Sequence, residues 1–488
     1  GFTRRAFAVD AVSRADSSMS FASLAQAAPN VSVWDDRALR HSVDRAHAGA
    51  GVSWQVTDSA LVGAVAVVDA QGSSQTFLAG AVDEGGLAVR VPRDDAPATR
   101  PAVAIVADSS ATARVLVDST GHLAAPVLSS GWTRFAYALA MQDVRVWVAP
   151  PSAANAHMVD RRSVRSRLSA LAPFFAQGSA VAPIWVADTL AWVVDMYSAS
   201  PTYPLSRHLV AAGAERAYFQ HAATAIVNSA SGRVAFVADS SPDPVAATWM
   251  AQFPKLFQRP TALRSGVKEQ LPPAIDGARA QAAAFGRFGT RGETDVVRHL
   301  PDDDGPDSAL VDLTPPPVGL PRSPVTAIIL PLLDRTEHVR GLFVAFGGPT
   351  HRSAWLPARD PSPGWSESLD RLRASDTATA PALVRGYVRV IPVGERIVTV
   401  QPRYDLRGSG PPRLLYVAAV IGDSVRSAHS IYQLSGRAAS TAPISNADFR
   451  TRVQELYNDM RRASTRGDWG RYGRAFDALG ALLRQPRR

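Results

Sequence analysis

The apolar segments of this chain are all short, and this feature constrains its fold more than any other. The longest runs, ALVGAVAVV and LLYVAAVIG, have the length of β-strands, whereas a helix that spans a bilayer needs about 20 apolar residues. Many other runs alternate apolar and polar residues, as strands with one buried face do. With 488 residues, 46% of them hydrophobic, the chain can bury a large core. We therefore expect a mixed α/β (α+β) fold with a β-rich body, several helices and no membrane-spanning segment.

Local patterns place the expected elements along the chain. Residues 52–117 hold alternating runs separated by Gly and Asp turns, which predict strands. GWTRFAYALAMQD and RRSVRSRLSALAPFF have helical spacing, and the second helix should end at Pro173. PIWVADTLAWVVDMYS predicts a pair of strands. HAATAIVNSASGRVAFVADSS predicts a hairpin that turns at Ser231 and Gly232.

The stretch FVADSSPDPVAATWMAQFP places two aspartates and two prolines after an apolar run. Asp243 is a good helix N-cap, and Pro244 suits the first helical position, where no amide is needed. Asp239 is expected to order the turn. We interpret the stretch as a strand end followed by a helix, and acid–base work by Asp239 or Asp243 is the alternative.

Composition divides the chain into three predicted regions. Residues 301–326 are rich in Pro, Asp and Gly and are the best linker candidate, and a second polar segment covers 351–380. We predict a mixed α/β domain over residues 1–310, a β-rich region over 311–443 and a basic helical hairpin over 444–488.

The predicted C-terminal αα-hairpin has the clearest local pattern. Ser445 can cap a first helix, in which Phe449, Val453, Leu456 and Met460 share one face. After a TRGD turn, a second helix carries apolar residues at spacings of three and four, namely Trp469, Tyr472, Phe476, Leu479 and Leu483.

No motif that could carry catalysis or bind a cofactor is complete. GDS, at 422–424, follows an apolar strand like a hydrolase nucleophile block, but the only later histidine is His429 and no acid lies three residues before it. We interpret GDS as a hairpin turn. PDDDGPD, at 301–307, resembles half of a calcium loop but lacks its twelfth-position acid. The chain has no cysteine, and its ten histidines are scattered. We therefore predict no catalytic, metal-binding or cofactor-binding residues.

The positive charge comes almost entirely from arginine. Lys255 and Lys268 are the only lysines, and the formal net charge is +9. Residues 448–488 carry ten arginines against five acids. Because the chain has no zinc knuckle, RNA-binding signature or interleaving of aromatic and basic residues, we expect no nucleic-acid partner. An acidic protein or anionic lipid headgroups fit this charge at least as well.

Several segments resemble one protein family and occur in the expected order. They are GFTRRAFAVD, VWDDRAL, RLSALAPFF, LAWVVDMYSASPTYPLS, HAATAIVNSASGRVAFVADSSPDPVAATWMAQFPKLF, VTVQPRY and GDWGRYGRAFDALGALL. The family consists of uncharacterised bacterial membrane proteins that have several N-terminal transmembrane helices and a large extracytoplasmic domain. The resemblance covers nearly the whole chain and is most specific over residues 165–257. It implies that the chain corresponds to the extracytoplasmic domain, close to a membrane, and it implies no activity.

This chain departs from the family pattern at several polar positions. Family members typically have Asp-Ala-Tyr-Thr where this chain has Asp195-Met196-Tyr197-Ser198, and Val-Asp-Ala where it has Val227-Asn228-Ser229. The loss of ionisable groups on a retained scaffold suits a protein recruited for binding. The resemblance thus favours a detached copy of the domain that docks on a membrane complex.

We therefore expect a non-catalytic, periplasmic subunit at the membrane surface that stabilises an integral membrane complex. The expected partner is a bacterial photosynthetic reaction centre with its light-harvesting antenna. Association through arginines should weaken at about 0.5 M salt, where the Debye length is only about 4 Å. The expected partner-binding residues are arginines of the C-terminal hairpin and tryptophans in loop-like stretches: Arg461, Arg462, Arg466, Arg471, Trp355 and Trp365.

Two alternatives remain open. One is an extracytoplasmic hydrolase that uses acids such as Asp195 and Asp239 in a cleft, which two carboxyl groups about 5–9 Å apart would favour. The other is the excised extracytoplasmic part of a multi-pass protein. Because the chain starts at Gly1 without a methionine, removal of a signal peptide or membrane anchor is consistent with the sequence.

Overall fold

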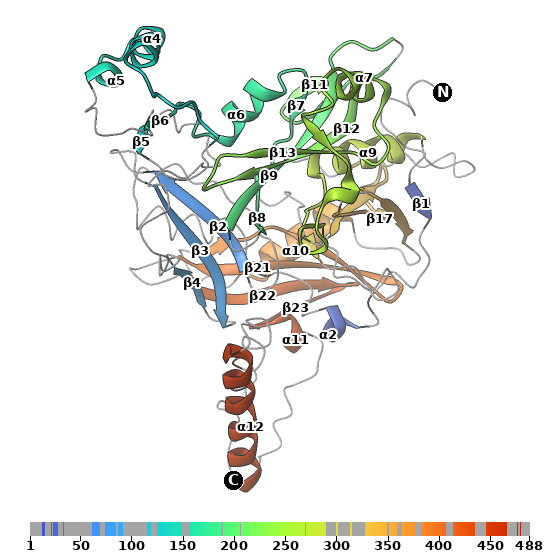
Figure 1. Cartoon of the computed structure of the whole chain (residues 1–488). Coiled ribbons are helices and arrows are strands. Elements are labelled where there is room, and N and C mark those ends of the chain that lie inside the picture. Colours follow the sequence, from blue (N-terminus) through green and yellow to red (C-terminus); the bar gives the residue numbers. More distant parts are fainter. Residues whose placement is uncertain are drawn as a thin grey trace.

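The computed structural model of the chain contains several sheets with helices around them, which confirms the mixed α+β class (Figure 1). Among the described residues, no helix is long and apolar enough to cross a membrane. The structure describes residues 12–14, 21, 23–27, 33, 61–68, 74–83, 86–90, 115–118, 124–148, 156–288 (except 187–188, 205 and 269), 299–300, 313–314, 327–348, 351–358, 364–376, 383–406, 413–434, 446–465, 476 and 479.

A six-stranded sheet, with strand order β14-β13-β12-β9-β7 and β8 also paired to β9, holds the central part of the chain. The predicted hairpin is present, because β12 and β13 are antiparallel and Gly232 has a φ of +69° in the turn between them. The predicted strand pair is formed by β8 and β9. The strands are β7 (Ala176–Gln177), β8 (Ala182–Val186), β9 (Thr189–Ser200), β12 (Tyr218–Asn228), β13 (Val234–Ala238) and β14 (Phe257–Gln258).

Three helices of this part, α4, α6 and α7, lie where the sequence predicts them, whereas α5, α8 and α9 were not predicted. Asp243 caps its helix by accepting hydrogen bonds from the amides of Val245 and Ala246, and Pro244 occupies the first turn. The helix before Pro173 ends at Leu171. The helices are α4 (Gly131–Met141), α5 (Arg145–Val148), α6 (Val164–Leu171), α7 (Pro244–Gln252), the 3-10 helix η4 (Pro260–Ala262), α8 (Ser265–Lys268) and α9 (Ile275–Phe288).

The alternating runs after residue 320 form two further sheets, of order β1-β18-β17-β16-β15 and β19-β21-β22-β23 with β20 on β21. The start of the chain joins them, because β1 pairs in parallel with β18 and Phe21 bridges to Val393. The predicted domain boundaries remain predictions. The strands are β1 (Val12–Arg14), β15 (Leu313–Thr314), β16 (Ala327–Leu333), β17 (Val339–Phe346), β18 (Ser353–Pro357), β19 (Leu383–Arg385), β20 (Arg389–Val393), β21 (Arg396–Asp405), β22 (Arg413–Ile421) and β23 (Ser424–Ala428).

The described residues of the polar segment 351–380 include a strand and a helix, so its two tryptophans do not lie in the loop-like stretches that the sequence predicted. Trp355 lies in β18, and Trp365 begins α10 (Trp365–Ala374). In α10 the residues Trp365, Ser368, Leu369 and Leu372 are buried, which is a helical face at spacings of three and four. The charged residues between them hid this period in the sequence.

Smaller elements complete the fold. The GDS segment is the predicted hairpin turn, because Ile421 pairs with Ser424 and Gly422 has a φ of +59°. The strands predicted over 52–117 are present. The small-sheet strands and short helices are β2 (Leu61–Val68), β3 (Ser74–Asp83), β4 (Gly86–Arg90), β5 (Val115–Asp118), β6 (Ala156–Val159), β10 (Leu209–Ala211), β11 (Ala214–Arg216), α2 (Leu24–Ala27) and α11 (Ile431–Leu434).

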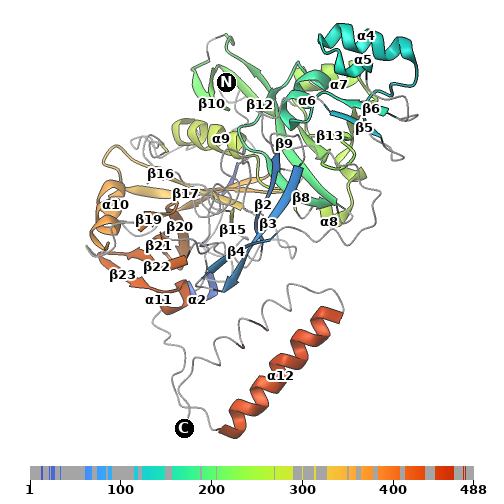
Figure 2. The same cartoon turned by 90° about the vertical axis from the view of Figure 1, so that its left-hand side faces the viewer.

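The first helix of the predicted C-terminal hairpin is α12 (Asn446–Thr465). Both views show α12 on the side of the molecule opposite to α4, α5 and α7 (Figures 1 and 2). Several predicted features lie outside the described residues: the Ser445 cap, the TRGD turn, most of the second helix, the PDDDGPD loop and most of the 301–326 linker.

Helix α9 packs where the six-stranded sheet meets the β15–β18 sheet. It is rich in alanine, and the buried Ala278, Ala282 and Ala284 let it lie close to the strands. A core cluster joins Tyr197 and Phe219 of the first sheet to Phe343 and Trp355 of the second around this helix. This junction holds the candidate site.

Candidate functional site

Four ionisable side chains meet beside α9, and we call them the His–Asp cluster: Asp195, His221, Asp239 and His351. Asp195 lies in β9 and His221 in the neighbouring β12. Asp239 follows the last residue of β13, and His351 lies between β17 and β18. The cluster therefore joins two sheets that are distant in the sequence.

A β-bulge in β12 orients His221. The pairing of β12 with β9 shifts register between His221 and Ala223, so His221 lies opposite Tyr197 and Thr224 opposite Asp195. Residues three apart on a regular strand point to opposite faces, but one extra residue turns them to the same face. His221 Nε2 accordingly lies 3.3 Å from both Asp195 Oδ1 and Thr224 Oγ1.

The two aspartates hold His221 from either side. His221 Nδ1 donates to Asp239 Oδ2 over 2.7 Å, while Asp239 Oδ1 accepts from the Ser241 amide and so orders the turn as predicted. Burial by itself lowers the pKa of His221, but the hydrogen bonds and charges of Asp195 and Asp239 outweigh it and raise this pKa to about 9. Burial opposes ionisation of Asp239 as well, yet its bond to His221 lowers its pKa to about 2.

His351 is the unusual member of the cluster. Its ring lies against that of His221, with 3.9 Å between the ring centroids. Burial, followed by the charge of His221, lowers the pKa of His351 to about 4. Its Nδ1 is buried without a hydrogen-bond partner, and its backbone has a φ of +41°, in the left-handed region. Both features are unfavourable by themselves, which is common at functional sites.

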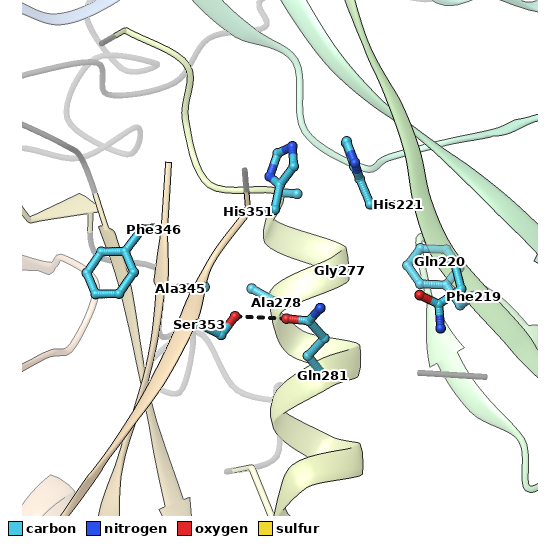
Figure 3. A pocket seen from close by; sticks show the side chains of 11 residues that line it. Phe219, Gln220, His221, Gly277, Ala278, Gln281, Ala345, Phe346, His351 and Ser353 are labelled. Atoms are coloured by element: carbon cyan, nitrogen blue, oxygen red, sulfur yellow. Dashed lines mark hydrogen bonds between the residues drawn. The ribbon is translucent and has the colours of Figure 1, made fainter. Parts of the chain in front are cut away.

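The two imidazoles face a small cavity of about 30 Å³ beside α9 (Figure 3). Its lining includes Phe219, Gln281 and Ser353, and the Ser353 hydroxyl donates to Gln281 Oε1 over 2.8 Å. Gly277 lets the helix approach, since a Cβ atom there would lie 3.2 Å from the Tyr197 ring. The Gly277 amide donates to the Tyr197 hydroxyl, which fixes the helix against β9.

Thr224, His221 and Asp239 have the order of a nucleophile, base and acid, but the geometry does not support nucleophilic catalysis. Thr224 is only 4% exposed, does not line the cavity and donates its hydroxyl to Asp195 Oδ1. A nucleophile must reach a substrate. The cluster is better suited to holding a cation, since it combines imidazole nitrogens with carboxylate oxygens.

A second unusual region is an exposed apolar surface on α4, α5 and the turn between them. We call it the α4–α5 face: Trp132, Phe135, Leu139, Val144, Trp147 and Val148. Trp132, Phe135 and Leu139 form one stripe of α4, which begins with a capping box between Ser130 and Thr133. Trp132 is 74% exposed. The Phe135 ring lies 5.6 Å from that of Trp132 and 5.3 Å from that of Trp147, measured between centroids.

Of the six residues expected to bind a partner, two are buried, two are exposed and two lie outside the described residues. Trp355 and Trp365 are only 5% and 4% exposed, so their indoles offer almost no surface. Arg461 and Arg462 are exposed on α12, and Arg466 and Arg471 lie outside the described residues. Asp195 and Asp239, the acids of the hydrolase alternative, do come together, with His221 between them.

Sequence reasoning missed His221, His351 and the α4–α5 face. A signal existed for His221, which is an ionisable residue within a nearly continuous apolar strand. The Trp132, Phe135 and Leu139 stripe was also visible as helical spacing, but such a stripe is usually covered by the core.

Part of the chain matches a known family. Residues 113–290 match the uncharacterised protein family UPF0182. The matched region includes the α4–α5 face and three members of the His–Asp cluster, and His351 lies outside it. The expected resemblance to an uncharacterised family is thus confirmed over this region.

The similar curated proteins are bacterial and carry the same family label. A UPF0182 protein of Clostridium acetobutylicum is 20% identical over 421 residues, which cover 75% of this chain and 44% of that protein. One from Nostoc is 29% identical over 170 residues, covering 32% of this chain and 16% of that protein, and one from Prochlorococcus marinus is 27% identical over 171 residues, covering 32% and 18%. The chain therefore spans less than half the length of these relatives. No solved structure matches it.

Proposed function

We propose that this chain is a non-catalytic, periplasmic accessory subunit that docks through the α4–α5 face on an integral membrane complex. The observation that carries the proposal is the cluster of six large apolar side chains left exposed on two adjacent helices and the turn between them. Full burial of one such side chain is worth about 1.5–3 kcal/mol. A partner that covers the face therefore gains a substantial driving force.

The chemistry of the face favours a partner at a membrane surface. Tryptophan is enriched both at protein interfaces and at the level of lipid headgroups. Helix α4 has no acidic residue, and its only charged side chain is that of Arg134. Further exposed apolar side chains lie on α6, on α7 and directly after α7, namely Leu171, Val245 and Phe253. Both views place these helices on the same side of the molecule as α4 and α5 (Figures 1 and 2).

With the α4–α5 face as the contact surface, arginine contributes less of the binding energy than the sequence predicts. The exposed Arg461 and Arg462 lie on α12, at the opposite side from the α4–α5 face. They would contact headgroups or a second partner rather than the surface that covers the α4–α5 face. Association through that face should then withstand about 0.5 M salt, because apolar contacts are not screened.

The decisive experiment is isolation of the tagged chain from its native membranes in a mild detergent. We expect an integral membrane complex to co-purify in fixed stoichiometry. An absorption spectrum tests whether that complex is a photosynthetic reaction centre with its antenna, for which the sequence resemblance is the only support. Recovery of the chain alone would contradict the docking proposal, and a pigment-free complex would contradict its photosynthetic version.

A matched set of variants tests the face itself. Trp132→Ser combined with Leu139→Ser should abolish co-purification, whereas Val210→Ser should not, although Val210 is 81% exposed and lies on the separate β10–β11 hairpin. Sedimentation of the purified chain should show a monomer. A stable dimer that the double substitution dissociates would mean that a second copy of the chain covers the face.

The multi-pass alternative makes a different prediction for the same face. If the chain is part of a longer protein, the α4–α5 face would meet membrane segments of that same protein. Transmembrane helices encoded upstream of Gly1 would support this alternative over a separate subunit.

A further inference from the structure

We propose that Asp195, His221 and His351 form a binding site for one divalent transition-metal ion, for which Zn²⁺ is the best fit. The three side chains offer one carboxylate oxygen and two imidazole nitrogens, and their ligand atoms all lie within 4.8 Å of one another. Imidazole suits zinc and its neighbours, whereas magnesium and calcium prefer oxygen ligands throughout. Two histidines with one carboxylate are a typical set for zinc that keeps a fourth position open.

The distances suit tetrahedral coordination. Zinc bonds of about 2.0–2.1 Å place neighbouring ligand atoms of a tetrahedron about 3.4 Å apart. His221 Nε2 and Asp195 Oδ1 are already 3.3 Å apart. The third ligand atom, from His351, needs a movement on the order of 1 Å to complete the set.

Asp239 supports the site without binding the metal directly. It accepts the Nδ1 proton of His221, which leaves Nε2 as the atom that faces Asp195. A histidine that ligates a metal commonly donates its other ring nitrogen to a carboxylate, which fixes its tautomer and orientation. The bulge at 221–223 and the turn at Asp239 thus both orient His221 Nε2 towards Asp195.

His351 provides an independent indication of a ligand. The structure gives its buried Nδ1 no partner and holds its backbone at a φ of +41°. A buried polar atom without a hydrogen bond is destabilising, and so is a left-handed residue other than glycine. The free energy of metal binding by the imidazole would offset the cost of the unpaired nitrogen and the cost of the left-handed backbone.

The charges around the site also favour a cation. Asp195 and Asp239 lie within hydrogen-bonding distance of the same imidazole, and their side chains are only 11% and 13% exposed. When a metal ion replaces the Nε2 proton of His221, two carboxylates remain beside neutral histidines with a charge of −2, which a divalent ion balances. Buried charges require such compensation.

The metal would connect two parts of the fold. Two ligands come from the β9–β12 pair and the third from the β17–β18 connection, so the ion would link the two sheets across α9. The cavity beside the imidazoles has room for about two water molecules. A fourth position that faces this cavity would hold an exchangeable water. The site is separate from the α4–α5 face, so the two proposals can fail independently.

The test uses the purified full chain, stripped of metal with a chelator and titrated with Zn²⁺ and Co²⁺. We expect one equivalent of Zn²⁺ by calorimetry and by metal analysis after dialysis. Bound Co²⁺ should show the intense visible absorption of a four-coordinate site. Melting temperature should rise with Zn²⁺, because a ligand that binds only the folded state stabilises it.

Variants locate the site. Asp195→Asn, which keeps the shape of the side chain, and His351→Asn, which suits left-handed backbone, should each weaken Zn²⁺ binding by at least tenfold. Asp239→Asn should weaken it by about 10–100-fold by loosening His221. The control is His208→Asn, which removes an exposed histidine paired with Glu215 over 2.9 Å.

The outcomes are clear-cut. Stoichiometric binding that Asp195→Asn abolishes and His208→Asn leaves intact supports the site, and circular dichroism of each metal-free variant shows that it is folded. If His351→Asn does not fold, Asp195→Asn alone decides. Absence of Zn²⁺ binding, or binding that only His208→Asn removes, would overturn the proposal.

Discussion

The His–Asp cluster and the α4–α5 face both depart from the usual distribution, in which ionisable groups lie at the surface and large apolar groups lie in the core. The cluster places four ionisable groups inside the fold, while the face leaves six large apolar side chains in water. Each arrangement is unfavourable unless something compensates for it. The cluster finds most of its compensation within the chain, through the bonds of His221 to two aspartates. Within the described residues, three rings of the face contact one another, but each is still at least 41% exposed.

This difference determines how defects in the two regions should be detected. Groups that compensate one another inside the fold contribute to the free energy of unfolding, so their removal should change stability. Groups that are covered only by an external partner contribute to association. Their removal should therefore leave the free energy of unfolding of the isolated chain unchanged.

Replacement of His221 by alanine should have the largest effect. It leaves Asp195 and Asp239 buried without their shared cation, and breaking a buried ion pair destabilises by about 3–5 kcal/mol. Urea denaturation at neutral pH measures this change. The matched variant His208→Ala, which breaks an exposed pair, should change the free energy of unfolding by less than about 1 kcal/mol. Equal losses for both variants would contradict the role assigned to the cluster.

Stability of the metal-free protein should reach a maximum near pH 6.5. The pKa of His221 is raised to about 9, so its stabilisation is complete below about 6.5 and is lost as pH rises towards 9. The pKa of His351 is lowered to about 4, so stability is lost as pH falls from about 6.5 towards 4. Each limb amounts to about 3 kcal/mol at most.

Thermal melts in a chelating buffer between pH 4 and 9 measure both limbs. Asp195 and Asp239 face both rings, and the pKa of Asp239, lowered to about 2, keeps its charge constant over this range. His351→Asn should flatten the acid limb and His221→Asn the alkaline limb. A profile that neither variant alters would show that other groups control it.

Substitutions on the α4–α5 face should have the smallest effect on stability. Trp132→Ser with Leu139→Ser should change the free energy of unfolding by less than about 0.5 kcal/mol per site, as is usual for exposed positions. The same variant should lose co-purification with the proposed membrane partner. A loss of several kcal/mol in the isolated chain would mean that the face packs against the chain itself.

The regular elements were predictable because their side-chain period is local. Strands such as β9 and β12 follow alternating or continuous apolar runs, and α7 follows its Asp243 cap and Pro244. The prediction failed for Trp365, which was expected in a loop-like stretch but begins α10, a helix that combines a buried face with many charged residues. There the helical period was present, but the polar composition obscured it.

The site was less predictable, since it depends on pairing between distant segments. His221 and His351 are 130 positions apart, and a bulge that no motif marks turns His221 towards Asp195. The sequence did single out Asp195 and Asp239 as possible partners in a cleft, but not the imidazole between them. The α4–α5 face was hidden for another reason, because a sequence does not show what covers an apolar stripe.

The parallel pairing of β1 with β18 has a practical consequence for dissecting the molecule. A fragment that starts near residue 311 would expose the β18 edge that β1 covers, and would lack Phe21, Leu24 and Ala27 from the core around β21. Uncovered strand edges invite pairing between chains. Such a fragment should therefore aggregate on expression, and adding residues 12–27 as a separate peptide should restore its solubility by strand complementation.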